Sequence, residues 1–148
     1  MLVNILINLF ERDLSKLEEE IAAYDSEEAL WRVPTGIKNS AGTLTLHLCG
    51  NLQHFIGAVL GQTGYVRNRE LEFSARNIPK EELLLQIGAT RRIVLTVILA
   101  LSPEDLEKIY TERVLAGELT TTGHFLVHLL AHLGYHLGQI NYHRRLTQ

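Results

Sequence analysis

Four histidines near the end of the chain are spaced for metal chemistry: His124, His128, His132 and His136 each follow the previous one by four residues. On an α-helix, residues four apart lie one turn apart on nearly the same face, with Cβ atoms about 5–6 Å apart. Two imidazoles at this separation can bind one divalent cation, at about 2.0–2.1 Å from each nitrogen. All four cannot reach a single ion, because they span about 18 Å along the helix axis. The spacing therefore predicts a site built on one neighbouring pair.

A third ligand is available from an earlier segment, where His47 and His54 lie seven residues apart and are expected on one helix face. One histidine from this helix and two from the last helix would form a three-ligand site inside a helical bundle. Three protein ligands leave coordination positions open for water or substrate, as in catalytic sites. Nitrogen ligation suits zinc, nickel, copper or iron. The alternative is structural, since a single histidine on an apolar face is more often a core or boundary residue.

Two amides are candidate catalytic or orienting residues. Asn51 follows His47 by one turn, and Gln139 follows His136 by three residues. Either amide could orient a ligand or a substrate, because a ligating histidine needs a partner for its other ring nitrogen. An ordinary polar residue at a helix boundary is the favoured alternative for both.

The long connection at residues 61–79 contains further charged residues, Arg67, Arg69 and Glu72. They could reach over the site and receive an anionic substrate. A solvated loop is the expectation that we favour for them, because connecting segments usually run over the protein surface.

Composition excludes several classes of protein. The 148 residues are 46% apolar and carry a net charge of −3, which predicts one globular domain over residues 1–148. No basic stripe is interleaved with aromatic residues, so no nucleic-acid partner is expected. The apolar run from Ile93 to Leu101 is shorter than the about 20 residues that span a bilayer, so no membrane association is expected. With one cysteine, Cys49, and no recognisable signal peptide, we expect a cytoplasmic protein.

Hydrophobic spacing predicts an all-α protein, a four-helix bundle. The long helices are expected at about residues 2–23, from a cap at residue 40 or 43 to about 60, from 79 or 80 to about 101, and from 121 or 122 to near the C-terminus. The β-branched residues 93–98 leave a buried strand as a competitor for part of the third helix. A long connection at residues 61–79 separates the second and third helices. The sequence Ser102-Pro103-Glu104-Asp105 predicts one short extra helix, because it combines a capping hydroxyl, a first-turn proline and acidic residues.

Two parts of the chain resemble the DinB-like (YfiT-like) metal-dependent family. The segment HLGYHLGQI at residues 132–140 resembles the His-x-x-x-His-x-Gly-Gln signature near the end of that family. The segments WRVP at residues 31–34 and KNSAGTL at residues 38–44, followed by His47, resemble its first half. The resemblance covers most of the chain in order and spacing.

This resemblance implies an up-down-down-up bundle, often a homodimer, with zinc or nickel held by His47, His132 and His136. It leaves His124 and His128 outside the signature, so we expect His124 near the helix start and His128 beside the ligands or in the core. Leu137 departs from the family pattern, since many relatives carry an arginine there that would contact an anion.

Family members of known activity are mainly transferases or isomerases that use a low-molecular-weight thiol. The resemblance therefore implies a divalent-metal-binding protein that acts as a metal-dependent hydrolase or transferase. The expected reaction is the transfer of a small thiol to an electrophile. A cation held by neutral imidazoles lowers the pKa of a bound thiol and so generates the nucleophilic thiolate. The alternatives are a non-catalytic metal-binding or stress-response protein, and a plain helical bundle whose histidines are structural. In the metal hypotheses, affinity should fall below about pH 6, because imidazoles must be neutral to bind.

Overall fold

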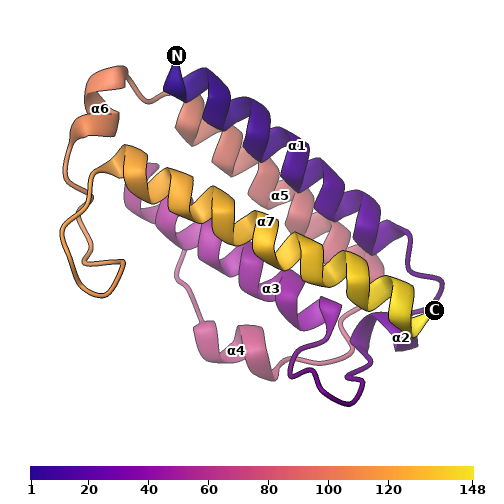
Figure 1. The fold of residues 1–148 in the computed structure, drawn as a ribbon. Helices are drawn as coiled ribbons and strands as arrows, with labels where there is room; N and C mark the ends of the chain where they lie inside the picture. Colours follow the sequence, from indigo (N-terminus) through magenta and orange to yellow (C-terminus); the bar gives the residue numbers. More distant parts are fainter.

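Four long helices form an elongated bundle in the computed structural model, which describes residues 1–148 (Figure 1). They are α1 (Leu2–Ala22), α3 (Ala41–Leu52), α5 (Lys80–Leu99) and α7 (Thr122–Thr147). The structure contains no strands, only two isolated β-bridges near the start of α7. The predicted helical bundle is therefore confirmed, and the β-branched segment that could have formed a strand belongs to α5.

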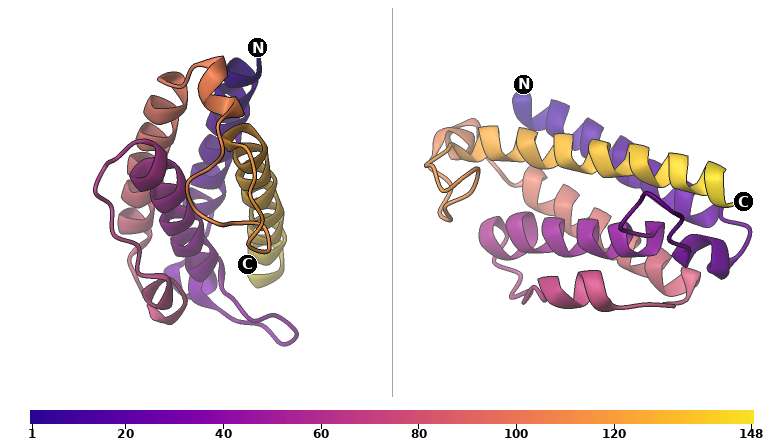
Figure 2. Two further views of the ribbon diagram at one scale, coloured as in Figure 1. Left: turned by 90° about the vertical axis from the view of Figure 1, so that its left-hand side faces the viewer. Right: turned by 60° about the horizontal axis from the view of Figure 1, so that its bottom comes forward.

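The packing of the long helices brings the histidine-bearing segments together. α1 packs against α5 and α7, and α3 packs against the same two helices, so α3 and α7 lie side by side (Figures 1 and 2). α1 shows why the bundle closes: its buried side chains recur every three or four residues, namely Leu6, Phe10, Leu14, Leu17 and Ile21. They belong to one core of 28 buried apolar residues. The up-down-down-up order of helix directions stays a prediction.

The second long helix changes its hydrogen-bonding pattern midway. It is α-helical to Leu52 and continues as a π-helix, η1 (Gln53–Leu60), so the helix reaches Leu60 as predicted but changes type on the way. Close packing accompanies the change, since a Cβ atom at Gly57 would lie 3.0 Å from Ile93 Cγ2 of α5. The π-helix begins at Gln53, between Asn51 and His54. The spacing of a regular α-helix therefore does not predict which face His54 occupies relative to Asn51.

Three short helices lie outside the bundle, where one was predicted. The predicted one is α6 (Pro103–Glu107), whose capping box joins Ser102 and Asp105: each backbone N–H donates to the other residue's side-chain oxygen, at 2.9 and 3.2 Å. The other two, α2 (Glu27–Trp31) and α4 (Arg69–Ser74), occupy segments that were expected to be loops. The side chain of the preceding residue, Ser26 or Asn68, caps each of these helices. The hydrophobic pattern did not reveal these helix starts.

None of the helices combines the length and the apolar character needed to cross a membrane. The long connection after η1 runs along the outside of α3, where α4 lies beneath that helix (Figure 2, right). This connection positions two of the charged residues of the site described next.

Candidate metal centre

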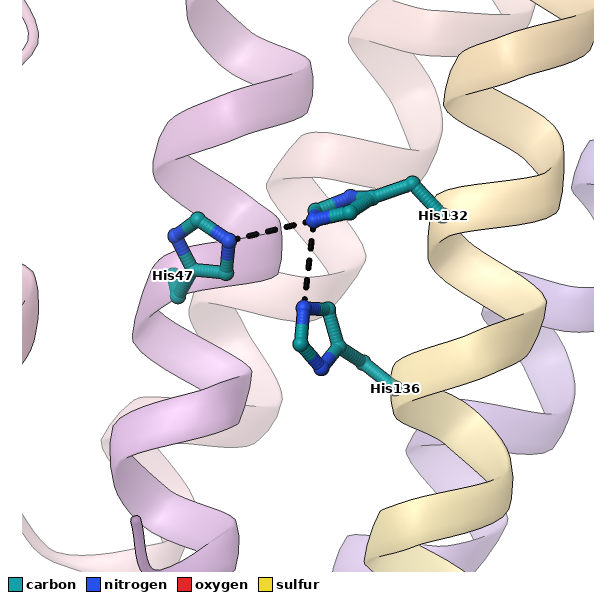
Figure 3. Close-up of side chains that lie close together, drawn as sticks. All are labelled: His47, His132 and His136. Carbon is teal, nitrogen blue, oxygen red and sulfur yellow. Dashed lines mark hydrogen bonds between the residues drawn. The ribbon is translucent and has the colours of Figure 1, made fainter. Parts of the chain in front are cut away.

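Three histidine rings converge between α3 and α7 (Figure 3). The Nε2 atom of His132 lies 3.2 Å from Nε2 of His47 and 3.1 Å from Nε2 of His136. The three ligand atoms all lie within 4.8 Å of one another. Two nitrogens bound to the same tetrahedral zinc ion would be separated by about 3.3 Å. The triangle is thus the right size for one ion after a small movement of the rings.

The protonation chemistry of this triangle also suits a cation. A neutral imidazole has one donor and one acceptor nitrogen, so Nε2 atoms that face each other cannot all carry protons. Burial, together with the neighbouring His136 and His47, lowers the pKa of His132 to about 4. Burial likewise lowers the pKa of His136, although its hydrogen bond to Gln139 opposes the shift. Both imidazoles are therefore neutral at pH 7, in the form that binds a metal.

Two of the three histidines have an acceptor on their second nitrogen. His136 Nδ1 lies 2.7 Å from Gln139 Oε1, and His47 Nδ1 lies 3.2 Å from Glu72 Oε1. An acceptor at Nδ1 holds the proton there and leaves the Nε2 lone pair facing the centre, as in many metal sites. His132 Nδ1 is buried and has no partner.

Asn51 is buried on the same helix as His47, and its Oδ1 atom also has no partner. Such orphaned buried polar atoms are rare in folded proteins. The site therefore has three nitrogen donors for one divalent cation, and α3 also carries an unpartnered buried oxygen. Ligation by His47, His132 and His136 itself stays a prediction.

Glu72 is the residue for which the favoured sequence interpretation, a solvated loop, differs most from the structure. Its carboxylate is buried and accepts hydrogen bonds from Arg67, at 2.8 Å from Nε to Oε2 and 2.9 Å from Nη2 to Oε1. Burial raises the pKa of Glu72, but the hydrogen bonds from Arg67 and His47 outweigh it, and the pKa is lowered overall. The expectation of a solvated loop is wrong for these two charged residues, whereas Arg69 is exposed and lies over the Phe73 ring.

A glycine makes room for this carboxylate. Gly50 lies one turn after His47 on α3, and a Cβ atom there would overlap the carboxyl group of Glu72. The missing side chain lets α4 approach α3 closely enough for Glu72 to reach His47. A glycine in the middle of a helix is costly, so it could have signalled such a close approach.

The structure does not bring the other histidines of the stripe to the centre. His124 and His128 are exposed, and the His128 ring stacks on Phe125 at 5.9 Å between centroids. The expectation of His128 in the core is therefore wrong, whereas a place beside the ligands stays a prediction. His54 pairs with Glu112 at 3.0 Å, away from the centre.

Comparison with known families gives one match. The model of the DinB superfamily matches residues 9–140, a range that includes all three converging histidines. No curated protein matches the chain.

Proposed function

The chain belongs to the DinB superfamily, and we propose that it is a metal-dependent transferase that joins a low-molecular-weight thiol to an electrophile. The convergence of three imidazoles at the α3–α7 contact carries the proposal. Zinc or nickel suits this donor set, because both accept imidazole nitrogen as a ligand. His47, His132 and His136 would hold the ion.

A bound divalent ion would supply positive charge that lowers the pKa of a nearby thiol and favours its thiolate. The reacting thiol must come from a substrate. The only cysteine of the chain, Cys49, is buried, and burial raises its pKa to about 11, so its thiol stays protonated and inaccessible.

The group transfer needs no oxidant or reductant. The thiol releases its proton to water, and its sulfur then forms a bond to an electrophilic carbon. With an alkyl halide, the carbon–halogen bond breaks and halide leaves with the bonding pair. With an epoxide, the ring oxygen takes that pair and then a proton from water.

The protein residues around the centre have positioning roles in this proposal. Gln139 and Glu72 hold the tautomers of His136 and His47, so that the Nε2 atoms remain available. Asn51 offers its unpartnered Oδ1 as an acceptor for a substrate or a water molecule. The resemblance to a family that often dimerises leads us to propose a cytoplasmic homodimer as well, which sedimentation velocity would test.

The proposal is tested by measuring metal content and thiol transfer on the same preparations. Untagged protein loaded with zinc or nickel should contain about one equivalent of metal. It should also accelerate the reaction of a cellular thiol, such as glutathione or cysteine, with monochlorobimane. His136→Ala should lose both properties, and His128→Ala, on the exposed part of the same helix, should keep both.

Each failure has a distinct meaning. Less than about a tenth of an equivalent of metal would overturn the metal site. Transfer activity that survives His136→Ala would overturn the ligand assignment. Full metal content without a rate for any thiol would favour the alternative, a non-catalytic metal-binding protein.

A further inference from the structure

A cavity of about 560 Å³ lies next to the metal centre, between the loop that precedes α3 and the C-terminal half of α7. Its walls are residues 34–39, Leu44 and the α7 side chains Gln139, Tyr142, His143 and Leu146. Binding sites for small molecules typically have volumes of about 300–1,000 Å³. Gln139 belongs both to this wall and to the metal centre, because it contacts His136.

The contact with His136 fixes the orientation of the Gln139 amide. If His136 binds a cation through Nε2, its proton is on Nδ1, and the atom 2.7 Å away must be an acceptor. That atom is therefore Oε1. The NH₂ group of Gln139 then has no protein partner and is available as a donor at the cavity.

The opposite wall contains a positively charged side chain that has no partner in the protein. Lys16 and Lys108 pair with acidic side chains, and Lys80 donates to backbone carbonyls. Lys38 is the one remaining lysine of the chain, and it makes no ion pair or side-chain hydrogen bond.

The wall offers no charge that would neutralise this cation. No carboxylate lines the cavity, and His143, which does, has both ring nitrogens bonded within the protein. The cavity thus combines one positive charge and a free amide donor with apolar surface from Leu44, Tyr142 and Leu146.

We propose that this cavity binds a small organic carboxylate whose apolar part packs on these side chains, with its carboxylate held by the Lys38 ammonium and the Gln139 NH₂. Hydrogen bonds to a carboxylate are stronger when a charged donor takes part. This site goes beyond the proposed thiol transfer, and its amide donor rests on the proposed cation at His136.

Phenylacetate and its neutral amide, phenylacetamide, test the proposal, because they have nearly the same shape and differ in charge. Titration calorimetry on the metal-loaded protein should show phenylacetate binding at least about tenfold more tightly than phenylacetamide. Lys38→Gln should remove most of this preference. Lys108→Gln is the matched control, since it changes the net charge equally at the end of α6, away from the cavity.

Gln139→Glu separates the cavity from the metal centre. The new carboxylate still accepts from His136 Nδ1, but it replaces the NH₂ donor by a negative charge and should abolish phenylacetate binding in samples whose metal content is measured alongside. Equal binding of the two probes, no binding of phenylacetate, or unchanged binding in both Lys38→Gln and Gln139→Glu would overturn the proposal. No thiol or electrophile is present, so phenylacetate binding by a protein without transferase activity would still support the cavity site.

Discussion

Helix α7 holds histidines in two very different environments. At its C-terminal end, His143 is buried and both of its ring nitrogens have protein partners. Nδ1 lies 2.6 Å from the Tyr24 hydroxyl, and Nε2 donates to the Arg32 carbonyl at 2.8 Å. This imidazole links α7 to the end of α1 and to the chain just after α2, and nothing in its surroundings calls for a ligand.

Three turns earlier, His132 lacks such partners. Its Nε2 faces two other Nε2 atoms, and its buried Nδ1 faces no acceptor. Buried polar groups are usually paired because an unpaired one costs about 1–3 kcal/mol. The comparison shows that burial alone does not mark a functional histidine. An imidazole whose two nitrogens bond to other groups of the fold is structural, whereas imidazole nitrogens that converge on one another indicate a binding site.

The same substitution at the two positions should have opposite effects. His132→Phe removes a ligand. Loss of a residue that only hydrogen-bonds to a ligand lowers metal affinity by about 10–100-fold, so loss of the ligand itself should lower it further. The metal-free variant should be as stable as wild type or more so, because Phe leaves no unsatisfied nitrogen. His143→Phe should keep the metal and lower the free energy of unfolding by roughly 1–3 kcal/mol, since the Arg32 carbonyl loses its partner and the Tyr24 hydroxyl keeps only the Ile140 carbonyl.

Competition with a chromophoric chelator measures the first effect, and urea unfolding of metal-free protein measures the second. The contrast between the two regions would be wrong if His143→Phe lost metal while remaining folded. It would also be wrong if His132→Phe bound metal like the wild type.

Glu72→Gln should weaken metal binding by about 10–100-fold without abolishing it. Glutamine can still accept from His47 Nδ1, but the negative charge that supports the metal-facing tautomer is lost, and Arg67 loses its ionic partner. Glu112→Gln is the matched control, because it alters the carboxylate that pairs with His54 outside the centre. Equal affinities of Glu72→Gln and Glu112→Gln would show that the buried carboxylate does not tune the site.

The sequence was most informative where the geometry is local. The spacing of four between His132 and His136 places both rings on one face of any α-helix, so their approach could be predicted without a structure. Spacing did not distinguish His47 from His54 as the third ligand. The family resemblance made that choice, and the π-helix that begins at Gln53 shows why spacing was not enough.

The sequence was least informative where contacts join distant segments. Glu72 reaches His47 across 25 positions because α4 packs on α3 at Gly50, and no periodic pattern encodes that contact. The same holds for His143, whose partners Tyr24 and Arg32 lie 119 and 111 positions away. Hydrophobic spacing predicts which face of a helix is buried, but not which polar atoms meet there.

Proton binding is where the two regions should behave alike. Burial lowers the pKa of His132 to about 4 and also lowers the pKa of His143, whereas an unfolded histidine titrates near 6.5. Below pH 6.5 the unfolded state therefore binds more protons, and the free energy of unfolding falls as the pH falls toward 4.

In metal-free protein, His132→Phe and His143→Phe should each lose less stability than wild type between pH 7 and pH 5. Because solvent screens these partly buried groups, the difference should be about 1 kcal/mol or less. Urea titrations at the two pH values measure it, and the common carboxylate contribution cancels in the comparison. A variant with the same pH dependence as wild type would show that its histidine is not held neutral by the fold.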